Sequence, residues 1–227
     1  MLCEKGRIAA EQSSRNWGWL RQQGRDLGEL PIVIEAMRHW REFGDLLGID
    51  RLGLRWTGIL KLARTKGQLA SFWPYMPTLR RDFGSTSFRP FAPKGFPDAW
   101  GTKRRWKAAS PFEEMRILSP KPNQAILRRT AEAMGAAFPA LKGLRIRQSW
   151  AGMIDTMPDV VPIVDEVPQI GGLILAAGMA GHGFGIGPGF GRVLADMAQG
   201  KPAGHDMSRF RFARFFDGSK IDFGAAL

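Results

Sequence analysis

The sequence predicts a mixed fold, between α/β and α+β, from three observations. Stretches with apolar residues at helical spacing alternate along the chain with short apolar or alternating stretches typical of strands. Their order is not a regular series of strand, helix and strand, so α+β character is expected in part of the chain. The length of 227 residues and the hydrophobic content of 44% are those of a globular protein with one ordinary domain or two small ones.

The first half of the chain contains five predicted elements. Residues 1–8 indicate the end of a strand. Residues 30–47 carry apolar side chains at helical spacing and predict a helix. Residues 51–63 favour two short strands, and residues 65–77 favour a second helix that two prolines interrupt.

The second half contains five predicted elements. Residues 123–138 place apolar side chains on one side and predict a helix. Residues 144–150 alternate and predict a strand, and residues 160–164 predict a short one between prolines. The apolar residues 173–177 predict a buried strand, and residues 192–198 a helix.

A run of glycines joins the last two elements. The segment from Gly178 to Gly191 reads GMAGHGFGIGPGFG, in which Pro188 is typical of a first helical turn. A bare loop before a helix start exposes N–H donors and the positive end of the helix dipole, which suits a phosphate, a carboxylate or the anionic edge of a reduced flavin. The spacing fits neither the phosphate loop nor the dinucleotide-binding fingerprint. A plain glycine-rich connector is the alternative.

Composition excludes several classes of protein. The single cysteine, Cys3, allows no internal disulfide, which fits a reducing cytoplasm. Three scattered histidines do not suit a metal cluster, so no metal is expected. No apolar stretch is long enough to span a bilayer, and the charged N-terminus lacks the pattern of a signal peptide.

The net charge of +12 favours binding to anionic partners such as nucleic acid, acidic lipid or an anionic cofactor. Residues 103–107 and 209–215 interleave cations with aromatic side chains, as proteins that bind single-stranded nucleic acid do. A solvated strand or tail has the same pattern, and no recognition motif accompanies the charge. Nucleic acid is therefore not expected as a partner, and a basic nucleic-acid or membrane-surface binding protein stays an alternative.

Four segments in order resemble a known family. Residues 179–188, MAGHGFGIGP, resemble the C-terminal flavin-contacting segment of the FAD-dependent D-amino acid oxidase, glycine oxidase and sarcosine oxidase group. Residues 4–6 with 13–18, residues 150–163 (WAG, then PD and PI) and residues 211–215 (RFARF) resemble other segments of the same group. Together these segments span nearly the whole chain.

The resemblance implies a remnant of an FAD-binding Rossmann-like domain plus part of an antiparallel-sheet substrate domain. Residues 1–72 would be a partial FAD-binding region with a helical segment, residues 73–150 a partial substrate or cap region, and residues 151–227 the C-terminal flavin-contacting part. The implied cofactor is FAD, and the implied reaction moves a hydride from a small-molecule amine or amino acid to the flavin.

The resemblance also implies roles for single residues. Glu4 would accept hydrogen bonds from the adenosine ribose, although an ordinary surface glutamate is the alternative. Ser13, Ser14 and Arg15 would lie near the pyrophosphate and the flavin, although serines there also suit a helix N-cap. His182, the only catalytic candidate, would face flavin or substrate, although a structural histidine is equally compatible. The flavin loop would comprise Gly181, His182, Gly183, Phe184, Gly185, Ile186 and Gly187.

The chain departs from the group in length and in one motif. The Gly-x-Gly-x-x-Gly turn that holds the FAD pyrophosphate is not found in the sequence, and the group's middle region is missing, with a join expected near residues 70–73. The sequence therefore suggests a truncated member. It would be either an FAD-dependent oxidoreductase or a non-catalytic relative, such as a subunit whose partner supplies the nucleotide-binding unit.

Overall fold

The computed structural model describes residue 4 and residues 6–58 and 119–221, in two compact units. One unit comprises residues 1–17 and 89–153, and the other comprises residues 18–88 and 154–227. Cys3, the predicted second helix, the basic residues 103–107 and the expected join lie outside the described residues. The predicted division into regions 1–72, 73–150 and 151–227 stays a prediction.

Helices and one small antiparallel sheet make up the described chain, which confirms the mixed fold class. The α-helices are α1 (Leu30–Leu47), α2 (Ile49–Leu52), α6 (Gln124–Ala137) and α7 (Gly183–Ala198). The strands are β1 (Ile163–Glu166) and β2 (Ile174–Ala177). Short 3₁₀ helices are η1 (Gln12–Arg15), η2 (Pro139–Leu141), η3 (Ser208–Phe210) and η4 (Phe212–Phe215).

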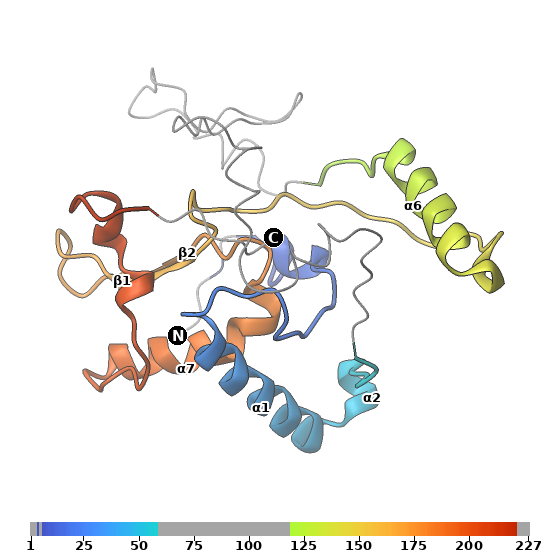
Figure 1. Ribbon diagram of the computed structural model, residues 1–227. Helices are drawn as coiled ribbons and strands as arrows, with labels where there is room; N and C mark the ends of the chain where they lie inside the picture. Colours follow the sequence, from blue (N-terminus) through green and yellow to red (C-terminus); the bar gives the residue numbers. More distant parts are fainter. Residues whose placement is uncertain (1–3, 5, 59–118, 222–227) are drawn as a thin grey trace. The chain divides into compact units, whose positions relative to one another are not determined.

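The core of the larger unit lies between α1 and α7, which lie side by side in Figure 1. Helix α1 begins and ends where the apolar spacing predicts and buries Ile32 and Val33. Helix α7 contributes Phe190, whose ring meets Phe210 edge to face with centroids 5.3 Å apart. Burial of side chains of this size stabilises the fold by about 1.5–3 kcal/mol each, so these contacts hold the two helices together.

The sheet confirms one predicted strand and shifts another. Strand β2 forms within the predicted residues 173–177 but is half-exposed rather than buried, because it belongs to a two-stranded sheet. Strand β1 pairs with it, Ile163 opposite Ala177. It starts three residues later than predicted, since Val160 has a φ of +60° and Pro162 has no N–H to donate.

Three predicted strands are wrong where the structure describes them. Residues 144–150 form no strand and are exposed; among the described residues no strand pairs with them, although their alternation is typical of one. Residues 49–52 form the single turn of α2, held by local hydrogen bonds, and residues 54–58 are irregular. At the N-terminus, Glu4 and Arg7 are irregular, Gly6 is a bend and Ile8 begins a turn, so these residues do not form the end of a strand.

The smaller unit contains α6, close to the predicted bounds. Asn123 caps it, because its side-chain oxygen accepts hydrogen bonds from the N–H groups of Ala125 and Ile126 at 3.0 and 3.1 Å. Gly135 lets the chain fold back onto the helix, since a Cβ there would lie 3.3 Å from the Cα of Lys142. None of the described side chains of α6 is buried.

Candidate functional site

The glycine run is largely helical. Helix α7 begins at Gly183, nine residues before the predicted start, so the predicted loop over residues 178–191 is shorter than expected. Pro188 lies inside the helix and not in its first turn, so that prediction is wrong. Each glycine costs a helix about 1 kcal/mol relative to alanine. The close approaches that several of these glycines permit explain why they are nevertheless present.

Two of the helical glycines, the packed glycine face, serve contacts within the protein. A Cβ on Gly189 would lie 2.6 Å from the backbone oxygen of Ile32, which is closer than real Cβ atoms come. A Cβ on Gly185 would lie 3.2 Å from the backbone oxygen of Trp19. Glycines four residues apart share one side of a helix, so Gly185 and Gly189 let α1 and the segment before it approach α7 closely.

The other three helical glycines, Gly183, Gly187 and Gly191, form a second row, the open glycine face. A Cβ on Gly187 or Gly191 would meet no described atom within 4 Å. A Cβ on Gly183 would meet only the side chain of Met179, in the turn before the helix. Contacts within the described chain therefore do not explain the bare backbone at Gly187 and Gly191.

A tight turn precedes the helix and is held by Asp155. Gly178, Ala180 and Gly181 have φ values of +68°, +48° and +76°. The N–H of Gly178 donates to the Asp155 side chain, and the N–H of Ala180 donates to the Asp155 carbonyl, both at 2.8 Å. This turn leads from β2 into α7, whose first N–H groups lack partners inside the helix.

Aromatic side chains flank the first turn of α7. The indole of Trp40 donates a hydrogen bond to the backbone oxygen of Gly185 at 3.0 Å. Its ring lies 5.3 Å from that of Phe184, which is 40% exposed. Ile186 is fully buried in the core. The start of α7 is therefore fixed from the α1 side and presents an exposed aromatic ring.

His182 is the N-cap residue of α7 and is buried. Its Nδ1 lies 3.8 Å from the carboxylate of Glu29, which is the N-cap residue of α1. Arg25 approaches the same carboxylate, with its Nη1 4.0 Å from Glu29 Oε2. The sequence analysis did not single out Arg25 or Glu29, because no motif distinguishes them from ordinary charged loop residues.

The predicted N-terminal site residues lie in the other unit. Glu4 is exposed, and its carboxylate accepts a hydrogen bond from the N–H of Gly6 at 2.7 Å. Ser13 and Ser14 lie inside η1, so neither is its N-cap, which is Glu11. Arg15 donates to the Glu11 backbone oxygen at 3.0 Å. That Glu4, Ser13, Ser14 and Arg15 share a ligand with Gly181–Gly187 stays a prediction.

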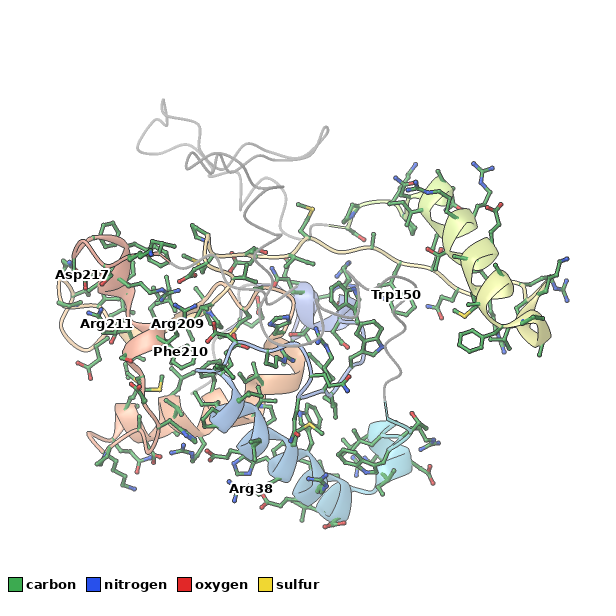
Figure 2. The ribbon with its side chains drawn as sticks, viewed as in Figure 1. Arg38, Trp150, Arg209, Phe210, Arg211 and Asp217 are labelled. Carbon is green, nitrogen blue, oxygen red and sulfur yellow. The ribbon has the colours of Figure 1, made fainter. Side chains whose placement is uncertain are left out.

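The basic aromatic segment 209–215 is paired inside the larger unit. Arg209 contacts Asp26 at 2.9 Å, and Arg211 contacts Asp217 at 2.9 Å; Figure 2 labels Arg209, Phe210, Arg211 and Asp217. Arg214 binds the buried Asp159. Because carboxylates of the same chain neutralise these cations, the structure favours an anchoring role over nucleic-acid binding for this segment.

Neither a membrane span nor a metal site is found among the described residues. No helix there is both long enough and apolar enough to cross a bilayer. In the same part of the chain, no three His, Cys, Asp or Glu side chains gather as metal ligands would.

Residues 1–111 and 73–197 match a family described as "FAD dependent oxidoreductase". The chain is 39% identical over 101 residues to sarcosine oxidase subunit beta of Rhizobium meliloti (strain 1021), over 44% of this chain and 24% of that protein. It is 38% identical over 61 residues to N-methyl-L-tryptophan oxidase of Salmonella dublin, over 27% of this chain and 16% of that protein.

Among solved structures, L-amino acid deaminase from Proteus vulgaris matches 48% of this chain with a TM-score of 0.44 and 30% identity, and the match covers 25% of that chain. The matched part is thus a quarter or less of each of these relatives. The family match itself covers residues 1–197, which include the start of α7 and all the candidate site residues. This chain therefore belongs to the family of FAD dependent oxidoreductases.

Proposed function

We propose that this chain is the part of an amine- or amino-acid-oxidising flavoenzyme that holds one edge of the FAD isoalloxazine ring at the start of α7. Gly187 on the open glycine face carries this proposal, because packing within the described chain does not explain its lack of a side chain. The names of two relatives, sarcosine oxidase and N-methyl-L-tryptophan oxidase, support an amine or amino-acid substrate.

The residues at the start of α7 fit an anionic planar group. The first N–H groups of the helix and its dipole favour negative charge next to Gly183 and Phe184. A flat ring can approach the backbone at Gly187, since a Cβ there would meet no described atom within 4 Å. The packing of Trp40 against Phe184 and Gly185 holds this turn in place before any ligand arrives.

When bound, FAD supplies the hydride acceptor, and the protein supplies binding and orientation. The N–H groups and dipole at the start of α7 would hold the flavin and would favour negative charge on it. His182 stands at the same helix end and adds a proton-dependent charge there. Glu4, Ser13, Ser14 and Arg15 are proposed to contact the adenosine and pyrophosphate parts.

A pair of variants tests this site by FAD titration, followed through quenching of flavin fluorescence. Gly187→Leu places a side chain on the proposed flavin contact, whereas Gly191→Leu adds the same side chain one helical turn further on. Gly187→Leu is expected to weaken FAD binding by about tenfold or more, as loss of a close contact costs at least about 1.4 kcal/mol. Equal effects of the two variants, or no binding of FAD in any assembly, would contradict the proposal.

A second form of the function is a subunit that binds FAD only with a partner chain. It is favoured by the sequence, in which we find no Gly-x-Gly-x-x-Gly turn for the pyrophosphate. We expect flavin to co-purify with an assembly larger than the 25.2 kDa chain. Flavin bound stoichiometrically to a 25.2 kDa monomer in size-exclusion chromatography would rule this form out. A cytoplasmic location, which the single cysteine supports, is proposed for either form.

A further inference from the structure

Two helix N-termini meet at the pair formed by Glu29 and His182. Glu29 is the N-cap residue of α1, and His182 is the N-cap residue of α7. The Glu29 side chain has no exposed surface, and that of His182 is only 2% exposed. Their closest polar atoms, Glu29 Oε2 and His182 Nδ1, are 3.8 Å apart. Both ionisable groups are thus buried at the N-terminal end of α7, where the proposed function places the flavin.

The environment of Glu29 makes its charge costly. Within the described part of the chain, neither carboxylate oxygen of Glu29 accepts a hydrogen bond, and Nη1 of Arg25 donates none. Burial raises the pKa of Glu29 to about 7, although Arg25 opposes this shift. Burial likewise lowers the pKa of Arg25 to about 10. The carboxyl group therefore exchanges its proton near neutral pH.

The charged groups around Glu29 come from three parts of the larger unit. Arg21, Arg25 and Asp26 belong to the segment before α1, His182 begins α7, and Arg209 belongs to the C-terminal segment. Asp26 and Arg209 pair with each other at 2.9 Å. Among the described residues, the ionisable nitrogen atoms within 4.0 Å of the Glu29 carboxylate thus belong to His182 and Arg25.

We propose that Glu29 and His182 hold one proton between them, and that Glu29 is a positioning residue that sets the charge of the His182 ring at the first turn of α7. Glu29 and His182 share this proton in the protein without flavin. The consequence for reduced flavin rests on the proposed function, since a cationic ring at that turn stabilises an anion bound there. Glu29 would act through His182, without touching flavin or substrate.

The test is an NMR pH titration of the full chain without flavin, observing the imidazole signals of its three histidines. Single His→Gln variants assign the signals of His39, His182 and His205. In Glu29→Gln, the proton affinity of His182 is expected to fall about tenfold, because an opposite charge at this distance shifts a titration by one unit or more.

Glu35→Gln is the matched control on the same helix. Glu35 contacts His205 and His39. This variant is expected to leave the proton affinity of His182 unchanged. A His182 titration that is the same in the unmodified chain and in Glu29→Gln would overturn the proposal, as would an equal response of His182 to both variants.

A second measurement needs no substitution, in case Glu29→Gln does not fold. In the unmodified chain with ¹³C-labelled glutamate, the carboxyl signal of Glu29 is expected to change over the same pH range as the ring signal of His182. Independent titrations of the two groups would contradict proton sharing. Failure of the chain to bind FAD would reject the proposed function and leave both NMR results interpretable.

Discussion

Asp159 and Arg214, 55 residues apart, form a buried bidentate ion pair that ties the C-terminal segment to the residues before β1. Nε and Nη2 of Arg214 donate to the two carboxylate oxygens at 2.7 and 3.1 Å. Nη2 also donates to the backbone oxygen of Val161 at 2.6 Å, and Nη1 donates to the backbone oxygen of Arg211 at 2.8 Å. The pair thus joins two segments that carry the family resemblance.

Removal of one partner of this pair should destabilise the larger unit strongly. Arg214→Met leaves the Asp159 charge buried and unpaired, which costs about 3–5 kcal/mol. Arg211→Met removes a more exposed pair with Asp217 and should cost about 1 kcal/mol or less. Urea unfolding followed by far-UV circular dichroism measures the free energy of unfolding of both variants. Similar decreases in the two would contradict the larger contribution of the buried pair.

The packed glycine face predicts opposite effects at two helical positions. Gly189→Ala places a Cβ against the backbone of Ile32, so α1 and α7 must separate, at a cost of about 1–3 kcal/mol. Gly191→Ala meets no described atom and should stabilise the helix by up to about 1 kcal/mol. Thermal unfolding of both variants tests this difference, and a lowered Tm for Gly191→Ala would mean that something else covers that residue.

Glu35 predicts a loss of stability in acid. Burial alone would raise its pKa, but hydrogen bonds from Arg192 and His205 outweigh burial and lower the pKa from 4.5 to about 2. Because the folded carboxyl binds its proton more weakly than the unfolded one, its contribution is complete above about pH 4.5 and fades as the pH falls toward 2.

Glu35→Gln should therefore be less stable than the unmodified chain at neutral pH, and the difference should shrink as the pH falls toward 2. Denaturant unfolding at a series of pH values measures the difference. The control is Glu42→Gln. Glu42 is exposed and contacts His39, which is also a partner of Glu35. A difference that stays constant with pH would contradict the depressed pKa of Glu35.

The cap of α6 predicts a local effect in the smaller unit. Asn123→Ala removes the acceptor for the N–H groups of Ala125 and Ile126 and should destabilise α6 by about 1 kcal/mol. Amide hydrogen exchange at residues 125–130 should become faster, while α1 and α7 exchange as before. Asn123→Asp keeps an acceptor oxygen and should restore slow exchange; fast exchange in that variant would argue against capping.

Local sequence alone determined the elements whose stability depends on nearby residues. The bounds of α1 follow from its apolar spacing, and those of α6 follow from its spacing and the cap at Asn123. The resemblance carried by four segments together, residues 179–188 among them, also predicted the family that the comparisons show. The strand predicted over 144–150 failed because alternation indicates a strand only where a partner strand can pair with it.

Tertiary structure decided the candidate site. Seven glycines from Gly178 to Gly191 predict a loop from local propensity, yet contacts with Ile32, Trp19 and Trp40 favour a helix from Gly183 onward. Likewise, the positions of Glu29 and Asp159 in the sequence do not reveal His182 and Arg214 as their partners. Both pairs join residues that lie far apart along the chain. Only the folded chain brings such distant groups together, because burial and charge pairing depend on three-dimensional neighbours.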